Sequence, residues 1–487
     1  MKGVDQMGYS DFINLHSHSE YSNCFGVKDS TNRIDRMILY VANELKQKGF
    51  ALTEHEFIGN HVKAYSTVRT LKSKNKIPQD FKLILGNEIY LVDEQQLKQS
   101  LEEKKGVKFY HFILLAKDKI GHQQLQELST RAYSHFFNYR HIDRRPLYYD
   151  DVEEVIDKNP GHIIASTACL GGFLASHILA GEYDKARGFI DWCLDVFGEG
   201  NFFLEMQPHK KEYDEQGNEV ESEQEIVNRW IQKEGLQTII TTDAHYLKES
   251  DRELHKAYLK SDEDEETYAS GGRETDSFYA TTYFMDTEEI RGKLNYLPSS
   301  FIDNCFKNSV DVWESCEEYD LAQHTIIPSI PLPTEWNYNQ AIARTVMSND
   351  FPYIHQMLKS ENEYDRYLIY LAFEGILERR IPEDEWYDTL KRLDIEMCEL
   401  IGISRAKDAV VSSYFITMHK MINIFWNEAK CFTGCSRGSA AGWILNYLLQ
   451  ITQENPLKQP TEMYHWRFIS AERPDYPKCV GVVVVNQ

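Results

Sequence analysis

Seven short apolar segments alternate with amphipathic segments between residue 12 and about residue 245. In order, they read FINLH, GFALTEH, KLILGNEIYL, FYHFILLA, HIIASTAC, FFLEMQ and QTIITTDAH. After the first of them, Ile34, Ile38 and Val41 recur at helical spacing, which predicts a helix with one buried face. Strands that alternate with helices favour a parallel sheet with crossover helices. Seven such units predict an α/β fold with a closed or nearly closed barrel, whose polar groups gather at the carboxyl ends of the strands.

The rest of the sequence predicts a linker and a second, mostly helical domain. The segment IIPSIPLPTEW contains three prolines and cannot continue a helix, so we expect an extended linker there. Helices are expected over residues 364–404 and 412–430, followed by a Gly-rich turn at 434–442 and an apolar helix. We therefore expect a barrel domain over residues 1–285 with an exposed acidic loop at 262–266, a connection over 286–340, and a second domain over 341–487.

Composition and charge restrict the class of protein. No run in the 487 residues reaches the ~18 apolar positions that a membrane span needs, and the first residues, MKGVDQMGYSDF, lack a secretory signal pattern. A cytoplasmic protein without membrane contact is therefore expected. The nine cysteines are irregularly spaced, which indicates buried thiols or metal ligands rather than disulfides. A formal net charge of −23 argues against a broad basic surface for nucleic acid, although metal ions held by carboxylates can meet phosphates themselves.

Histidine and carboxylate side chains are concentrated at the predicted strand ends. His16 and His18 are two residues apart, so in a strand both point to one face and can share a metal ion. Asp243 and His245 repeat this spacing on the last predicted strand. Other segments add Asp29, His55, Glu88, His111 and Cys169. Burying so many ionisable groups unpaired would cost free energy, so the pattern predicts a metal site.

Five of these segments carry a resemblance to a known family. NLHSHSEYS, ALTEHE, LGNEIYL, STACLGG and TTDAHYL resemble, in order and spacing, the motifs of the polymerase and histidinol phosphatase (PHP) domain at the start of bacterial DNA polymerase III alpha subunits. KDKIGHQQLQELSTRAY and RGSAAG also fit, so the resemblance covers essentially the whole chain, and a split or phage-encoded form is one interpretation. The resemblance implies a distorted seven-stranded (β/α)7 barrel that holds two or three divalent ions and acts as a 3′–5′ exonuclease.

The resemblance also implies a ligand set and a mechanism. Carried over by position, the metal ligands are His16, His18, Asp29, His55, Glu88, His111, Cys169, Asp243 and His245. The mixture of imidazole, thiolate and carboxylate favours zinc or manganese, and the implied reaction is metal-assisted phosphodiester hydrolysis. Glu205 and His209, at the end of the sixth predicted strand, are candidates for orienting these ligands, with plain loop residues as the alternative.

The chain departs from the family pattern at two places near the ligands. The family has Thr-Asp-His where this chain has Thr53, Glu54 and His55, so a longer carboxylate stands beside the ligand. The loop that leads to Asp29 has three extra residues and carries Phe25 where the common spacing has an aspartate. Asp29 is therefore the ligand that the pattern supports least.

The Gly-rich turn GCSRGSAAG predicts a phosphate-binding site. A turn of this kind before a helix suits the binding of phosphate oxygens. With SSYFITMHKMINIFWNEA before it and ITQENPLKQPTEMYHWRFISAER after it, the turn resembles the polymerase beta-like nucleotidyltransferase palm of the same family. The resemblance implies that Arg437, Gly438 and Ser439 contact the triphosphate of an incoming nucleotide.

The palm pattern is interrupted before the family's catalytic aspartates. This chain has Lys478 and Cys479 where the aspartate pair belongs, and Asp475 is out of register with it. We therefore expect an incomplete palm that polymerises DNA only with a second polypeptide, on a DNA primer-template with dNTP, and magnesium only in that completed site. A gene split, an intein that begins at Cys479 and a truncated reading frame are all compatible with this pattern.

Three functions fit the sequence. The leading hypothesis is the N-terminal part of a replicative polymerase alpha subunit with a working exonuclease barrel. The second is a small-molecule phosphoesterase of the same barrel superfamily, for which the palm-like residues would have no purpose. The third is a catalytically inactive structural half of a split polymerase, in which the metals only brace the fold.

Overall fold

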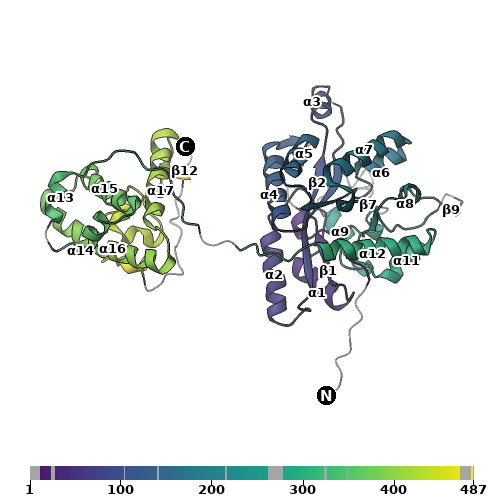
Figure 1. Ribbon diagram of the computed structural model, residues 1–487, viewed down its shortest axis with the longest axis horizontal. Helices are drawn as coiled ribbons and strands as arrows, with labels where there is room; N and C mark the ends of the chain where they lie inside the picture. Colours follow the sequence, from purple (N-terminus) through teal and green to yellow (C-terminus); the bar gives the residue numbers. More distant parts are fainter. Residues whose placement is uncertain are drawn as a thin grey trace, which may run out of the picture. The chain divides into compact units, whose positions relative to one another are not determined.

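Six strands and one bridging segment form the central sheet of the first part of the chain (Figure 1). In sheet order the strands are β1 (Gly49–Leu52), β2 (Lys82–Leu91), β3 (Tyr110–Ala116), β6 (Ile163–Ser166), β7 (Phe202–Met206) and β10 (Thr238–Ile240). Residues 12–18 bond on both sides: Asn14 bridges to Phe50 of β1, and Ser17 bridges to Ala244 just after β10. Because this segment joins the two outer strands, the sheet curls into a distorted seven-stranded barrel, which confirms the predicted fold class.

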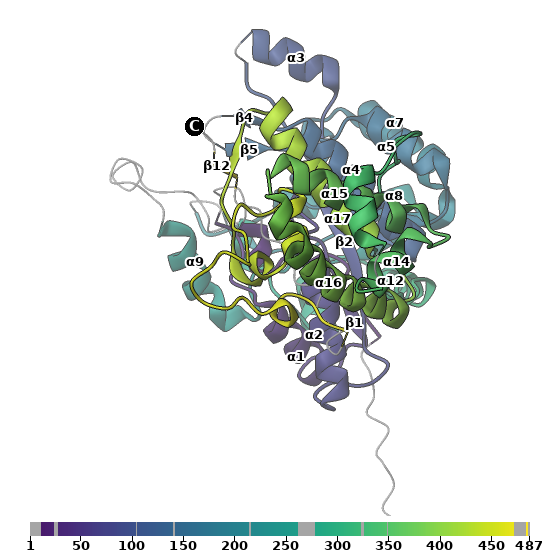
Figure 2. The same ribbon diagram turned by 90° about the vertical axis from the view of Figure 1, so that its left-hand side faces the viewer.

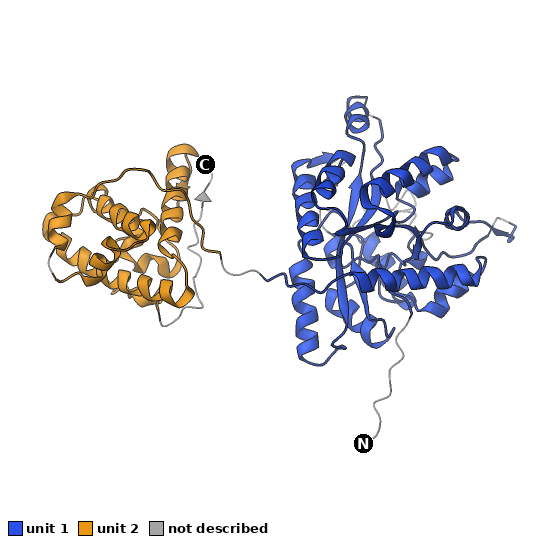
Figure 3. Ribbon diagram, in the orientation of Figure 1, with its two compact units in different colours: residues 1–322 blue, residues 323–487 orange. Residues whose placement is uncertain are grey.

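The chain divides into two units, residues 1–322 and 323–487, drawn in separate colours in Figure 3. The computed structural model describes residues 11–23, 28–103, 105–139, 142–213, 216–261, 278–322, 326–347, 349–471 and 484–485. Several predicted features lie outside the described residues, namely Phe25, the acidic loop at 262–266, Asp475, Lys478 and Cys479. None of the described helices is both long enough and apolar enough to cross a membrane.

β3 runs antiparallel to both of its neighbours, which corrects the expectation of a parallel sheet. Ile113 of β3 pairs with Glu88 of β2 on one side and with Ser166 of β6 on the other, both in antiparallel register. The helix between β2 and β3, α3 (Glu94–Glu102), projects from the barrel in both views instead of packing along the sheet (Figures 1 and 2). The chain therefore re-enters the sheet at the end where β2 left it, and β3 has to run backwards.

Amphipathic helices cover the outside of the barrel. They are α1 (Ile34–Asn43), α2 (His61–Ser73), α4 (Lys119–Ser134), α5 (Tyr149–Lys158), α6 (Phe173–Leu179), α7 (Tyr183–Phe197), α8 (Glu223–Glu234), α9 (Arg252–Lys260) and α11 (Thr287–Lys293). The helix predicted after the first segment is α1, and its buried face contains Ile34, Ile38 and Val41 as the spacing required. α8 begins at the Ser222 cap and ends at Gly235, whose positive φ of 70° stops the helix.

One further helix closes the barrel at the amino ends of its strands. α12 (Ser299–Ser315) lies there because Ser309 Oγ accepts a hydrogen bond from the Ile13 amide and Trp313 Nε1 donates to the Lys82 carbonyl, at 3.1 Å in both cases. The interior above α12 is filled by the buried side chains of Leu15, Ala51, Ile84, Ile113, Leu115, Ile164, Phe203 and Ile239. Since apolar residues fill this end, the ionisable residues are left at the opposite end, where most of the strands finish.

Two buried histidines join α2 to α4. His61 Nδ1 lies 3.1 Å from His122 Nε2, and His61 Nε2 lies 3.0 Å from the carbonyl oxygen of Gly86 in β2. Burial, together with the neighbouring His122 ring, lowers the pKa of His61 to about 3. The pair is therefore held in its neutral form in the folded protein.

Acid should destabilise the first unit through this pair. A histidine with a folded pKa below its unfolded value of about 6.5 binds fewer protons when folded, so stability is full above that value and falls toward the folded pKa. Each such group contributes at most about 1.4 kcal/mol per pH unit. We expect the difference in unfolding free energy between wild type and His61→Gln to shrink by up to about 3 kcal/mol from pH 7 to pH 4. Urea unfolding at several pH values tests this, and parallel pH profiles for the two proteins would contradict it.

The second unit is mainly helical. Its helices are α13 (Gln340–Val346), α14 (Pro352–Leu358), α15 (Glu363–Glu378), α16 (Trp386–Lys407), α17 (Ser412–Asn423) and α18 (Ile444–Leu448). Phe415 stacks on Trp443 with ring centroids 5.7 Å apart, and Phe468 packs edge-on against both rings. The Pro-rich segment contains no helix or strand, and its Ile327, Ile330 and Leu332 pack against this core.

Candidate metal centre

Four of the predicted ligands meet at the rim of the barrel. His16 and His18 lie on the closing segment, both completely buried, and their Nε2 atoms are 3.0 Å apart. Asp243 Oδ1 lies 3.1 Å and 3.0 Å from these two atoms, and Glu88 Oε2 lies 3.4 Å and 3.2 Å from them. Asp243 reaches this position with a left-handed backbone, φ 46°. Residues other than glycine seldom adopt this conformation, and where they do it is often at a functional site.

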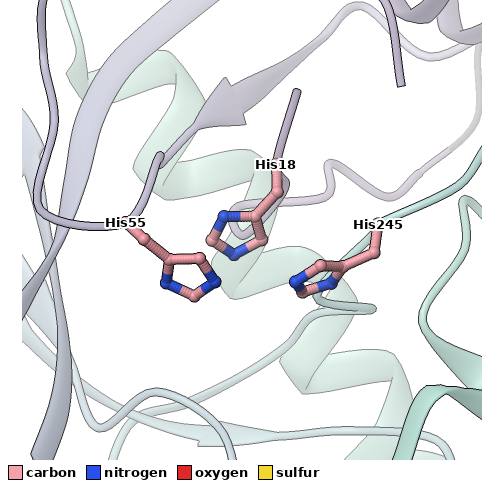
Figure 4. Close-up of side chains that lie close together, drawn as sticks. All are labelled: His18, His55 and His245. Atoms are coloured by element: carbon pink, nitrogen blue, oxygen red, sulfur yellow. The ribbon is translucent and has the colours of Figure 1, made fainter. Parts of the chain in front are cut away.

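A second group of ligands lies beside the first. Asp29 Oδ2 is 2.6 Å from His55 Nε2 and 3.0 Å from His245 Nε2. The His18 ring stacks on both other rings, with centroids 4.2 Å from His55 and 4.4 Å from His245, and the three rings form a triangle because His55 and His245 are themselves 5.8 Å apart (Figure 4). The structure therefore brings Asp29 to the rim despite the longer loop that precedes it.

Glu88 connects these groups to the remaining candidates. Its Oε2 lies 2.8 Å from His55 Nδ1, and its Oε1 lies 2.6 Å from His111 Nδ1. Cys169 Sγ lies at the edge of the cluster, 3.5 Å from the same His111 nitrogen. His111 occupies the start of β3, so the reversed direction of that strand is what places it at the rim.

The nine residues thus converge from separate segments onto one end of the barrel. Three subsets have ligand atoms that all lie within 4.8 Å of one another: His18, His55 and His245; His16, His18 and Glu88; and His55, Glu88 and His111. The assignment of all nine as metal ligands remains a prediction, because the contacts place the atoms together without identifying what they bind.

The electrostatics of the cluster fit divalent cations. Burial alone would lower the pKa of His16, but the carboxylates of Asp243, Glu205 and Glu88 raise it well above the ordinary value. Burial would likewise raise the pKa of Glu88, yet His111, His55 and His16 hold it well below its usual range. Such strongly opposed shifts mark a concentration of charge that a bound cation would balance.

Two orphaned oxygen atoms provide a sharper test of whether metal ions fit. Glu88 Oε1 and Asp243 Oδ1 are buried and accept no hydrogen bond from a described residue, although ring nitrogens lie 2.6 Å and 3.1 Å away. The nearby nitrogens are close but not oriented to donate, as expected where lone pairs converge on a common ion. Imidazole, carboxylate and thiol groups together form a donor set suited to zinc or manganese.

Glu205 orients His16, whereas His209 contacts none of the ligands in the described residues. His16 Nδ1 donates to Glu205 Oε1 at 2.7 Å, which leaves His16 Nε2 facing the cluster. Glu205 is buried and also accepts hydrogen bonds from Ser166 and Thr241, each at 2.6 Å. The sequence alone did not distinguish Glu205 from His209 as an orienting residue. Among the described residues, Glu205 bonds to a candidate ligand and His209 does not.

Glu54, which stands where the family has an aspartate, bonds to residues next to the cluster and not to the candidate ligands. Its carboxylate accepts hydrogen bonds from the amide and hydroxyl of Ser19, from the Ser22 hydroxyl and from Asn60 Nδ2. The Ser22 oxygen in turn lies 2.9 Å from His18 Nδ1. Because Ser22 donates to Glu54, it accepts from His18 Nδ1, which turns the other ring nitrogen toward the cluster.

Replacing Glu54 with glutamine should weaken metal binding without touching a ligand. Ser19, Ser22 and Asn60 all donate hydrogen bonds to the Glu54 carboxylate, and the NH₂ group of glutamine cannot accept them. The turn that contains Ser22 would therefore be held less firmly. Losing such an outer partner typically costs about 10- to 100-fold in metal affinity. We expect a loss in that range when metal is titrated against a chelating dye. Wild-type affinity in a folded variant would contradict it.

Sequence reasoning missed three contributors to the site. The Tyr279 hydroxyl donates to Asp29 Oδ1 at 2.6 Å, and His255 of α9 donates from Nε2 to the Asp29 carbonyl. Tyr90 stacks on the His111 ring with centroids 4.6 Å apart. His255 could have been noticed as a histidine on the apolar face of an amphipathic helix. Nothing in the local sequence identifies Tyr279.

The Gly-rich turn of the second unit is exposed at its tip and rigidly held at its base. Arg437 and Gly438 are exposed, Ser439 is partly buried, and Gly438 has a positive φ of 67°. A 3₁₀ turn over Gly438–Gly442 leads directly into α18. The three residues predicted to contact a triphosphate are therefore available to a ligand, and their role remains a prediction.

A buried ion pair on α16 supports this turn. Glu396 is completely buried and accepts hydrogen bonds from the Ile444 and Leu445 amides at 2.7 Å and 2.9 Å. Arg392 donates to Glu396 and to the Gly442 carbonyl, at 3.1 Å and 2.6 Å. Burial raises the pKa of Glu396 to about 7 even though these donors oppose the shift.

Two known domain families match this chain, one in each unit. The PHP domain family matches residues 14–209, and the bacterial DNA polymerase III alpha NTPase domain family matches residues 366–479. The class of protein is therefore a PHP-domain protein with a polymerase III alpha-type second domain. A solved structure described as a "putative metal-dependent phosphoesterase", from Bifidobacterium adolescentis, covers 59% of this chain and 97% of its own at 12% identity, with a TM-score of 0.28.

Two related proteins align with almost the whole of this chain. The probable DNA polymerase YorL of Bacillus subtilis is 38% identical over 96% of this chain and 36% of its own length. The DNA polymerase III subunit alpha of Borreliella burgdorferi is 26% identical over 96% of this chain and 35% of its own length. The chain is homologous to the N-terminal part of DNA polymerase III alpha subunits. It spans about a third of the length of these relatives.

Proposed function

We propose that the first unit is a metal-dependent phosphodiesterase that removes nucleotides from the 3′ end of DNA. The observation that carries the proposal is the convergence of five histidines, three carboxylates and one cysteine on one barrel rim. Divalent ions bound there would lower the pKa of a water molecule, orient it toward phosphorus and stabilise the leaving 3′ oxygen. The match of the second unit to a polymerase III alpha domain favours a phosphodiester of DNA as the substrate over a small phosphate monoester.

The protein's own residues would hold the ligands in a fixed orientation. Glu205, Ser22 and the Asp243 carbonyl engage the Nδ1 atoms of His16, His18 and His245, so the Nε2 atoms of these rings face inward. His111 and His55 retain 24% and 14% side-chain exposure, while His16 and His18 have none. The exposed pair therefore marks the side from which a phosphate would approach.

The second unit is proposed as part of a polymerase palm that binds nucleotide phosphates at Arg437, Gly438 and Ser439. The family match over residues 366–479 and the exposed turn support this assignment. Polymerisation is the activity named for the relatives as whole proteins. We therefore propose it, with primer-template DNA, dNTP, magnesium and a second polypeptide, for a completed alpha subunit and not for this chain alone.

The decisive experiment is a hydrolysis assay on the purified chain. A primer labelled at its 5′ end, another labelled at its 3′ end and a small phosphate monoester are incubated with zinc or manganese. Stepwise shortening from the 3′ end, without hydrolysis of the monoester, supports the exonuclease. Preference for the monoester would favour the small-molecule phosphoesterase, and bound metal without hydrolysis of any substrate would favour a structural barrel.

A further inference from the structure

An arginine lies beside the two exposed candidate ligands and has no part in the reaction described above. Arg144 ends β5 (Ile142–Arg144), which forms a short hairpin with β4 (Phe137–Tyr139). The backbone that follows the hairpin is fixed next to the end of β2, because the Leu147 amide donates to the Tyr90 carbonyl at 2.9 Å. Arg144 is therefore held at the rim of the barrel, beside Tyr90.

Tyr90 connects this arginine to the ligands. The Arg144 Cζ atom lies 5.2 Å from the centre of the Tyr90 ring. The same ring stacks on His111 with centroids 4.6 Å apart, and its hydroxyl lies 3.3 Å from His55 Nδ1. Since the guanidinium and the His111 ring are separated by these two steps of 5.2 Å and 4.6 Å, they are at most about 10 Å apart. Arg144 is therefore a neighbour of His111 and His55, the two candidate ligands that retain 24% and 14% side-chain exposure.

The guanidinium of Arg144 makes no hydrogen bond within the described part of the chain. Its Nε is buried and unpartnered, whereas Nη1 and Nη2 are open to solvent, and the side chain retains 22% exposure. The one described carboxylate within 4.0 Å belongs to Glu56, whose Oε2 lies 3.9 Å from Nη1, too far for a hydrogen bond. Arg144 Cζ lies over the rings of Tyr90 and Phe109, 5.2 Å and 5.4 Å from their centres, and these contacts hold the side chain in place. Two accessible donors therefore remain for a ligand.

Phosphate is the ligand that suits this arginine best. A guanidinium presents paired N–H donors that match the oxygens of a phosphate, and a side chain already held against aromatic rings loses little further freedom on binding. The nearby carboxylates are engaged elsewhere: Glu56 Oε1 accepts a hydrogen bond from the Arg145 amide at 2.7 Å, and Glu88 lies among the histidines of the cluster. An anion is therefore the partner that Arg144 lacks, and a reaction at the adjacent ligands brings one.

We propose that Arg144 binds the phosphate held at the metal centre, through Nη1 and Nη2, on the side that His111 and His55 leave open. The proposal rests on the proposed phosphodiesterase function and adds a substrate-binding residue to it. The positive charge of Arg144 stabilises the negative charge that develops on the phosphate oxygens as the diester is cleaved. Because the contact is to the reacting phosphate itself, it serves small and polymeric phosphodiesters alike.

Arg144→Ala tests this contact in the hydrolysis assay. We expect kcat/KM to fall by about 10- to 100-fold on both bis(p-nitrophenyl) phosphate and a trithymidylate, as loss of a hydrogen bond to a charged group produces. Arg144→Lys keeps the charge without the paired donors, so its kcat/KM should lie between those of wild type and Arg144→Ala. Arg131→Ala is the matched control, because Arg131 has a similar side-chain exposure of 23% but is paired with Asp151 and Glu154. Unchanged rates in Arg144→Ala, or an equal loss in Arg131→Ala, would overturn the proposal.

A purely structural role, in which Arg144 only balances the buried carboxylate of Glu56, predicts a different result in a double mutant. Glu56→Gln removes that charge and keeps an oxygen acceptor for the Arg145 amide. If balancing Glu56 were the role, Arg144→Ala would cost no activity in the Glu56→Gln background. We expect the same loss, about 10- to 100-fold, in both backgrounds. A loss that disappears in the Glu56→Gln background would overturn the proposal.

A binding measurement separates failure of this contact from failure of the proposed function. Fluorescence anisotropy of a labelled trithymidylate with phosphorothioate linkages, measured with manganese over a range of salt concentrations, requires no hydrolysis. Arg144→Ala should bind more weakly than Arg131→Ala and reduce the slope of log K against log salt by about 0.7, the value for one phosphate contact on a single strand. If the wild type hydrolyses neither diester, this result would still support the contact. A slope equal to that of Arg131→Ala, or no binding by the wild type, would overturn it.

Discussion

Replacing Glu88 with glutamine should reduce phosphodiester hydrolysis by at least about a thousandfold, equivalent to about 4 kcal/mol of activation free energy. Glu88 lies within 3.4 Å of a ring nitrogen in four histidines, His16, His18, His55 and His111. Glutamine preserves its size but removes the charge that links both halves of the ligand cluster. A neutral amide is a poor ligand for a divalent ion, and its NH₂ group would point donors at ring nitrogens.

The variant is compared with wild type in the 3′-end assay and in metal content per chain. We expect the lost activity to accompany the loss of at least one bound ion. Glu314→Gln on α12 is the matched control, because Glu314 is exposed at the far end of the barrel. Near-wild-type rates in Glu88→Gln would show that Glu88 does not belong to the centre.

Removal of the metal ions should abolish hydrolysis and destabilise the first unit selectively. Without cations, neighbouring histidines are the groups in the described part of the chain that balance the buried carboxylates of Asp29, Glu88 and Asp243. An ion present at 100 times its dissociation constant stabilises the folded state by about 2.7 kcal/mol. For a unit of this size, that corresponds to a fall in Tm of about 4 °C on chelation.

Hydrogen exchange followed by mass spectrometry locates this effect. Exchange should increase around the ligand segments of residues 11–322 after chelation and return when zinc or manganese is added back. Peptides of the second unit serve as the internal control, because no residue of the cluster lies there. Equal loosening of both units, or no change in either, would contradict a metal centre confined to the barrel.

Much of the metal site follows from local sequence patterns. A strand projects alternate side chains to one face, so the spacing of His16 with His18, and of Asp243 with His245, predicted pairs that act together. The structure places both pairs at the same rim, but Asp243 and His245 lie beyond the end of β10 and Asp243 has a left-handed backbone, so strand alternation does not explain the second pair. The polymerase-like turn could also be predicted locally, because a Gly-rich turn before a helix is a short-range feature.

Other parts of the site depend on contacts between distant segments. Glu205 and His209 stand four residues apart, yet Glu205 orients His16, whereas His209 contacts the Lys210 carbonyl and Ser222 Oγ. The difference arises because β7 ends between them, so Glu205 still points into the barrel while His209 follows the loop outward. Tyr279 and His255 join Asp29 from segments more than 220 residues away, and no local pattern encodes those contacts.

The sequence by itself determined the seven strand-forming segments and the amphipathic helices between them, because these depend on short periodicities of apolar and polar residues. The resemblance to the PHP domain supplied the full set of candidate ligands. Only the tertiary structure decided the direction of β3, since α3 projects from the barrel instead of crossing it. That reversal brings His111 to the rim, where it meets Glu88. Two other features were likewise decided by the tertiary structure: the closure of the barrel by residues 12–18, and the support of His18 through Ser22 and Glu54. Both depend on contacts between segments far apart in the sequence, so no single segment specifies them.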